Sequence, residues 1–258
     1  MNAIARYCPN ITLFHFSDHA QSAIQRTALK AIAETTVMLG LYTFCIPFVV
    51  PASAALFTYG MASQLGVQLV FRIAYEYQKY LGPSANQKFK EFLISGYSLN
   101  AAMAMYNGQV LVHELGHAAA AQALFSGANP KIRLIPYGGS GRTSFKAPIS
   151  NRGAFLLKVT AAGPIAGVAI ATILLIAALF LKNVSKPASA SCFWASFTGF
   201  WAHFSYALDA LSSPPSSSHD FQALAKAGYH PIVCATIILA IPLIIFAGVY
   251  FLQTRDRN

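Results

Sequence analysis

The sequence predicts an all-α polytopic membrane protein with five or six transmembrane helices and a short membrane-associated β-hairpin or strand. Of its 258 residues, 55% are hydrophobic and only 10% are charged, and the mean hydropathy is +0.49. Apolar stretches of about 20 residues, the length that crosses a bilayer, recur along the chain. A basic, acid-free loop between two of these stretches supports the same fold class, because such loops lie on the cytoplasmic side of membranes.

Charge and cysteine content exclude several other classes of protein. Eighteen Lys and Arg against eight Asp and Glu give a net charge of +10. In an apolar chain this excess indicates loops that face anionic lipid, and no basic run with interleaved aromatic residues predicts nucleic-acid binding. The four cysteines form no CxxC pair, which argues against a thiolate metal site and a disulfide framework.

The first part of the chain predicts a surface helix followed by membrane spans. Residues 1–35 are expected to form an N-terminal amphipathic segment, since apolar residues recur at helical spacing over 17–34. Residues 36–258 are expected to form an integral membrane domain. Its first stretch, 36–77, is almost entirely apolar and predicts either two short spans or one long kinked span, because Pro47 and Pro51 can interrupt a helix.

Residues 76–92 are polar and contain Gly82-Pro83, which predicts a loop outside the membrane. A helix over 94–125 is expected next, built mainly of Ala, Met, Leu and Val. Ionisable groups at bilayer depth are costly, so those in this helix are expected to face the bundle interior or a water-filled cavity and to be functional. Its polar members are Asn107, Gln109, His113, Glu114, His117 and Gln122.

The loop 127–153 contains five basic residues and no acid, so the positive-inside rule places it in the cytoplasm. Within it, Ile132 and Leu134 alternate with basic residues before a turn at Gly138-Gly139, which predicts an edge strand or a hairpin. A strand near a catalytic site could pair with an extended peptide by adding it to a sheet. A plain basic connection between two spans is the alternative.

Three further spans complete the expected fold. Residues 154–181 are strongly apolar, and Gly163-Pro164 is expected to break this helix. Its small residues are expected to allow close packing against helix 94–125. A less apolar span is expected over 190–211. The last span is expected over 231–252, after a Ser- and Pro-rich stretch.

Within helix 94–125, the sequence His113-Glu114-Leu115-Gly116-His117 is an HExxH motif. Two histidines four residues apart lie on one helical face, so both imidazoles can reach one zinc ion. The carboxylate of Glu114 is then suited to accept a proton from the attacking water rather than to bind the metal. This pattern indicates hydrolysis of a peptide or a related carbonyl compound. The alternative is a pair of buried histidines that neighbouring carbonyl groups satisfy.

A catalytic zinc ion usually has three protein ligands, so a third must come from elsewhere in the chain. Glu114 is the last glutamate, and Ala120 and Ala123 replace the residues of an extended HExxHxxGxxH motif. Asp220 follows a Pro-containing break and precedes a short helix-like segment, and its alternative role is a helix N-cap. His203 and Asp209 could instead make interhelical hydrogen bonds, and His219 could orient Asp220. The remaining downstream donors are His230 and, in the charged tail, Asp256.

Four segments in this order resemble the site-2 protease family of intramembrane zinc metalloproteases. They are HELGHAAAAQALF at 113–125, LIPYGG at 134–139, AAGPIAG at 161–167, and an Asp after a Pro-containing break. The resemblance covers about residues 94–228. It implies that His113, His117 and Asp220 bind Zn²⁺ and that Glu114 is the general base. Two positions depart from that family: Gly167 stands where Asn is common, and Phe221 stands where Gly commonly follows the ligand Asp.

The resemblance also implies a substrate and a location. The expected substrate is a transmembrane helix of a membrane protein, cleaved within the bilayer of the cell (inner) membrane with the active site toward the cytoplasm. The LIPYGG segment would present that substrate, through Ile135, Tyr137, Gly138 and Gly139. Two other hypotheses remain: a non-catalytic membrane binding protein that keeps the site, and a zinc transporter, for which the chain offers few intramembrane carboxylates.

Overall fold

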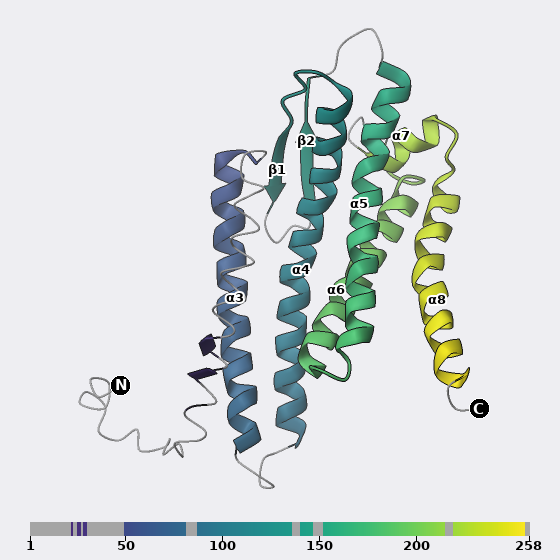
Figure 1. Cartoon of the computed structure of the whole chain (residues 1–258). Helices are drawn as coiled ribbons and strands as arrows, with labels where there is room; N and C mark the ends of the chain where they lie inside the picture. The colour runs from purple at the N-terminus through teal and green to yellow at the C-terminus, as the bar shows by residue number, and fades with distance from the viewer. Residues whose placement is uncertain are drawn as a thin grey trace.

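The computed structural model describes residues 22, 25–26, 28–29, 49–80, 87–135, 140–146, 152–214 and 219–255. These residues are mostly helical, as the sequence predicts, and the long helices run up and down beside one another (Figure 1). Most of the predicted amphipathic segment 1–35 and residues 36–48 lie outside the described part of the chain. In chain order the elements are α3 (Pro51–Tyr80), α4 (Gln87–Leu124), β1 (Lys131–Ile135), β2 (Ser140–Ser144), α5 (Arg152–Leu181), α6 (Lys186–Asp209), α7 (Asp220–Lys226) and α8 (Pro231–Arg255).

The first two helices are longer than the sequence suggests. Helix α3 continues to Tyr80 and α4 already begins at Gln87, so much of the loop expected over 76–92 is helical. Pro51 does not interrupt α3 because it is the first helical residue, where the missing N–H would have no intrahelical partner. Within the stretch predicted to hold one or two spans, residues 51–77 form a single helix, and residues 36–48 lie outside the described part of the chain.

The predicted break in α5 is wrong. Residues 152–181 form one helix with Pro164 inside it. Close packing against α4 holds this turn in place: a methyl group added at Gly116 of α4 would lie 2.5 Å from the Ala162 carbonyl oxygen, and one added at Gly163 would collide with the imidazole of His117. Proline is tolerated in a helix where neighbouring elements support the turn around it.

The predicted hairpin is confirmed as a two-stranded antiparallel sheet. Strands β1 and β2 pair in the register Lys131↔Ser144 to Ile135↔Ser140. Residues Ile132 and Leu134 of β1 are buried, and their neighbours along the strand are exposed, as the alternation in the sequence predicts. The outer edge of β1 is occupied by the segment before α3, because Val49 forms a parallel bridge with Ile132 and the Val50 N–H donates to the Ile132 carbonyl at 2.8 Å.

Apolar packing on both sides holds the HExxH segment of α4 in place. On one side, the hairpin and α3 form a buried cluster with α4 that includes Leu111, Ala118 and Ile132. On the other side, α4 packs against α5 and α6, which share a second buried cluster with α7 and α8; Leu175 and Phe221 belong to this cluster. The motif therefore lies between two packed groups of side chains, in the interior of the bundle as predicted.

Two of the described helices are long and apolar enough to cross a membrane. They are Phe155–Leu181 within α5, with a mean hydropathy of 2.6, and Pro231–Phe251 within α8, with a mean hydropathy of 2.8. Only 11% of the residues in the most apolar part of α8 are buried inside the protein. This is weak evidence of membrane association taken alone, and it leaves the number of spans open.

Candidate metal centre

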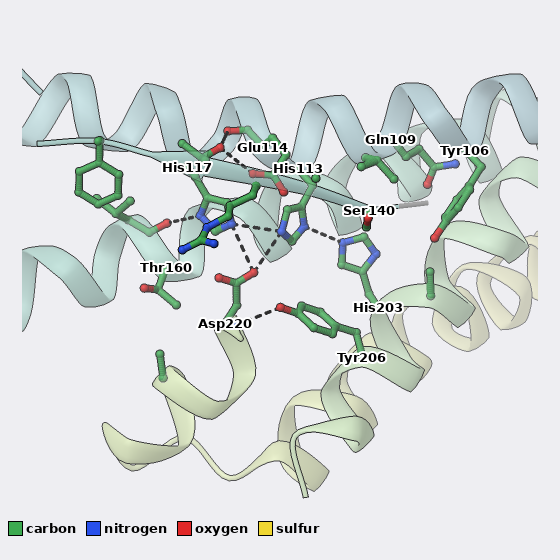
Figure 2. A pocket seen from close by; sticks show the side chains of 18 of the residues that line it. Tyr106, Gln109, His113, Glu114, His117, Ser140, Thr160, His203, Tyr206 and Asp220 are labelled. Atoms are coloured by element: carbon green, nitrogen blue, oxygen red, sulfur yellow. Dashed lines mark hydrogen bonds and ion pairs between the residues drawn. The ribbon is translucent and has the colours of Figure 1, made fainter. Parts of the chain in front are cut away.

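Three side chains from two helices converge on one point (Figure 2). The Nε2 atoms of His113 and His117 on α4 are 3.1 Å apart, and the Oδ2 atom of Asp220, the first residue of α7, lies 3.1 Å from the former and 3.3 Å from the latter. The two histidines are one helical turn apart on α4, and Asp220 begins α7. These three donors therefore meet although 107 positions separate His113 from Asp220 in the sequence. Among the described residues, this group could hold a metal ion.

In each histidine ring, the hydrogen bond that Nδ1 makes decides whether Nε2, which faces the other two donors, carries a hydrogen or a lone pair. Nδ1 of His117 lies 2.7 Å from the Val159 carbonyl oxygen, which can only accept, so Nδ1 carries the hydrogen and Nε2 presents its lone pair. His203 on α6 donates in the same way from Nδ1 to the Gly199 carbonyl at 2.8 Å. The Nε2 atom of His203 therefore accepts from Nδ1 of His113, 3.2 Å away, and Nε2 of His113 also presents a lone pair.

The result is three hydrogen-bond acceptors that face one another with no hydrogen among them. A cation placed between them relieves this repulsion, and their spacing fits one. In a tetrahedral site with metal–donor bonds of about 2.0–2.1 Å, two donors are about 3.3–3.4 Å apart. The observed separations of 3.1 to 3.3 Å are close to that value. The donor set and its spacing thus fit a tetrahedral metal ion with a fourth position left open.

The main chain before α7 fixes the position of Asp220. Its backbone N–H donates to the hydroxyl oxygen of Tyr206 on α6 at 3.1 Å, and the ring of Tyr206 stacks on His219 with centroids 4.2 Å apart. The Asp220 carboxyl completes the group of three donors, and it can bind a metal ion only in its ionised form.

The structure also shows where the other residues that the sequence offered as third ligands, or as partners of Asp220, are placed. Phe221, which departs from the site-2 protease pattern, is 3% exposed and anchors α7 in the second apolar cluster. His219 does not orient the Asp220 carboxylate; it stacks on Tyr206 and lies 3.5 Å from the half-exposed Asp209. His203 acts on His113 rather than joining the three donors. The ring of His230 accepts from the Ile232 N–H at the start of α8.

Glu114 is held on the opposite face of the group by strand β2. The Thr143 hydroxyl lies 2.6 Å from Oε2 of Glu114 and 3.0 Å from its backbone carbonyl oxygen. Gly141 provides the space for this side chain, since a methyl group there would lie 2.6 Å from Cγ and 2.8 Å from Oε1 of Glu114. The hairpin thus positions the carboxylate, which is 5% exposed and does not belong to the group of three donors.

All four predicted motif residues, His113, Glu114, His117 and Asp220, line one cavity of about 490 Å³. Strand β2 forms one wall of this cavity, from Ser140 to Thr143, and α5 and α6 contribute others. Of the predicted substrate-binding residues, Ile135 is exposed and does not line the cavity. Tyr137, Gly138 and Gly139 lie outside the described residues, so their predicted role is not tested.

Sequence reasoning missed Gly141, Thr143 and Tyr206, and it did not assign His203 its place behind His113. The run Gly138-Gly139-Ser140-Gly141 holds a partial signal, because a glycine beyond the turn of a predicted strand often marks close approach of another group. No such signal exists for Tyr206, whose contact with Asp220 depends on how α6 and α7 pack.

No protein-family model, curated protein or solved structure matches this chain.

Proposed function

We propose that this protein is an intramembrane zinc metalloendopeptidase, similar to the site-2 protease family, that cleaves transmembrane segments of membrane-protein substrates. The observation that carries the proposal is the position of Glu114. Its carboxylate lies in the same cavity as His113, His117 and Asp220, is bonded to Thr143, and is not one of the three donors. An HExxH pair with a separate, held carboxylate is the arrangement that metal-assisted hydrolysis requires.

Zinc is the metal that this donor set favours. Two imidazole nitrogens and one carboxylate with an open fourth position are typical of catalytic zinc sites. When bound, zinc would act as a Lewis acid, polarising the scissile carbonyl group and lowering the pKa of the attacking water.

The side chains of the chain itself supply the other steps. Glu114 accepts the proton of the attacking water and then donates it to the leaving amine, as a general base followed by a general acid. Thr143 keeps the carboxylate in place through a hydrogen bond to Oε2, which leaves Oε1 for the proton. Val159 and His203 keep the two ligand imidazoles in the required tautomer and orientation.

Exposed apolar surface supports a place within the membrane. In α8, Ile237, Leu243, Ile244 and Phe251 are each more than half exposed, as are Ile165, Ile173 and Phe180 in α5. Such surface is costly in water and favourable in lipid. We infer a multi-pass protein in which α4 and α6 span the bilayer as well, with the basic loop 127–153 and the catalytic group toward the cytoplasmic side of a cell (inner) membrane.

Strand β2 is better placed than β1 to hold an extended substrate. The residues expected to present the substrate include Ile135 on β1, but Val49 and Val50 occupy the outer edge of β1 at Ile132. Within the described residues β2 pairs only with β1, and residues 140–143 line the cavity. A transmembrane helix must unwind to expose its carbonyl groups, and pairing with β2 would satisfy the backbone of the unwound segment.

The proposal is tested with Glu114→Gln and a matched control on the same helix, Glu91→Gln, whose carboxylate is exposed and bonded only to Gln87 among the described contacts. The substrate is a model transmembrane peptide with an Asn-Gly helix break, and cleavage by zinc-loaded protein is measured by mass spectrometry. Loss of a general base costs about 10²- to 10⁴-fold. We expect that loss in Glu114→Gln, with unchanged zinc content, and wild-type cleavage in Glu91→Gln.

The alternative function, a non-catalytic membrane binding protein, predicts a different result. Equal rates in wild type and Glu114→Gln, or no cleavage by zinc-loaded wild type, would favour that alternative.

A further inference from the structure

The outward face of the hairpin is strongly basic. Residues on alternate positions of a strand share a face, so Lys131, Arg133 and Ile135 of β1 lie with Ser140, Arg142 and Ser144 of β2. In the antiparallel register Arg133 and Arg142 are directly opposite each other. Two like charges in directly opposed positions destabilise a sheet, so this pair needs a compensating negative charge.

The described part of the chain supplies no such charge. Its four carboxylates with described side chains are all engaged elsewhere: Glu91 with Gln87, Glu114 with Thr143, Asp209 with Ser213, and Asp220 with the two histidines. None of the ion pairs among the described residues includes either arginine. The sequence of the whole loop 127–153 contains no acid. Among the described residues, the negative charge that would compensate the two arginines is therefore missing.

Arg142 faces the place where a peptide would lie. It lines the cavity, and its neighbours on β2, Gly141 and Thr143, both contact Glu114 on the other face of the strand. A peptide strand added to the free edge of β2 would place one of its residues beside Arg142 on the same face, as a cross-strand neighbour. That residue would lie within a few positions of the bond that Glu114 acts on.

We propose that the cavity selects peptides with an acidic residue, Asp or Glu, at the position that pairs with Arg142. The proposal rests on the proposed function, since it names the class of substrate for the same site. An anionic lipid headgroup is the other source of negative charge. The structure favours the peptide because Arg142 lines the cavity that also holds the carboxylate of Glu114.

The test measures cleavage and binding separately in a nonionic detergent without lipid. The model transmembrane peptide carries Asp, Asn or Lys, one position at a time, over the eight residues around its Asn-Gly break. The protein variants are wild type, Arg142→Glu and the control Lys131→Glu, which makes the same charge change on the same face but pairs with Ser144 away from the cavity. Binding is measured by photo-crosslinking the peptides to Glu114→Gln, with and without Arg142→Glu, and needs no hydrolysis.

Opposite charges across a strand pair contribute a factor of about 1.4 to 5. We expect one peptide position at which Asp lowers KM and raises crosslinking by this factor relative to Asn, with Lys worse than Asn. Arg142→Glu should reverse the order, and Lys131→Glu should keep the wild-type order.

Three results would overturn the proposal: equal KM and crosslinking of the Asp and Asn peptides at every position, an Asp preference that survives Arg142→Glu, or a preference that arises only when anionic lipid is added. If no peptide is cleaved but crosslinking still follows the charge as expected, the acidic preference stands and the proposed hydrolytic function fails.

Discussion

The two flanks of helix α4 differ in how completely their polar groups are satisfied. On the flank that faces α5, α6 and α7, the imidazoles of His117 and His113 have fixed partners behind them, the Val159 carbonyl and His203, and the Asp220 main chain is held by Tyr206. On the flank that faces the hairpin, Thr143 holds Glu114, but Arg133 and Arg142 oppose each other without a carboxylate among the described residues.

This difference separates two tasks. The three candidate metal donors are positioned by the chain itself, so they would be in place before a metal ion arrives, which reduces the cost of binding. On the hairpin flank, only Glu114 has its partner within the described chain, and we propose that the substrate binds at the unpaired edge of β2 and beside Arg142. Variants on the first flank should therefore change metal affinity, whereas variants on the second should change hydrolysis or substrate choice with the metal still bound.

The largest expected effect is that of Asp220→Ala on metal binding. Changing even a group behind a ligand costs about 10- to 100-fold in metal affinity, and loss of a ligand should cost more than about a hundredfold. Elemental analysis of detergent-purified protein should give near-stoichiometric zinc in the wild type and little in Asp220→Ala. The control Asp209→Ala, an exposed carboxylate 3.5 Å from His219, should keep its zinc. Equal zinc in both variants would exclude Asp220 as a ligand.

A smaller and purely catalytic effect is expected for Gly141→Ala. The added methyl group would lie 2.6 Å from Cγ of Glu114, so the carboxylate must move, and displacement by about 1 Å can cost about 10²-fold in rate. Zinc content should not change, because the three donors face the other flank. Gly153→Ala is the matched control, since nothing lies within 4 Å of the added methyl group. A parallel loss of zinc and activity would contradict the division between the two flanks.

Patterns within one element were predictable from the sequence, and contacts between elements were not. The alternation of Ile132 and Leu134 predicted the hairpin, and the apolar stretches predicted the long helices. The break at Pro164 was wrong because the support that keeps α5 continuous comes from Gly116 and His117 of another helix. The extension of α4 back to Gln87 was missed for a related reason, since polar residues at a helix end do not by themselves show where it begins.

The candidate site shows the same distinction between patterns within one element and contacts between elements. His113, Glu114 and His117 follow from helical spacing alone. The sequence left Asp220 as one of several possible donors. Only the packing of α7 against α5 and α8 brings it to 3.1 Å from His113. His203 was a candidate ligand by residue type, but its role depends on which of its nitrogens faces the Gly199 carbonyl, which no sequence pattern encodes.

The smallest effect is expected when the hydrogen bond between Nδ1 of His113 and Nε2 of His203 is removed. His203→Leu should weaken zinc binding about tenfold, the lower end of the range for a group behind a ligand, because His113 remains on the same helical face as His117. His203→Gln offers a side-chain oxygen that can accept from Nδ1 of His113, so it should restore most of the affinity. Gly167→Ala should resemble His203→Leu, since a methyl group there would collide with the His203 imidazole.

Zinc affinity is measured by competition with a chelator, with thermal unfolding as a check on folding. If His203→Leu and His203→Gln lose affinity equally, His203 fills space and does not set the tautomer of His113.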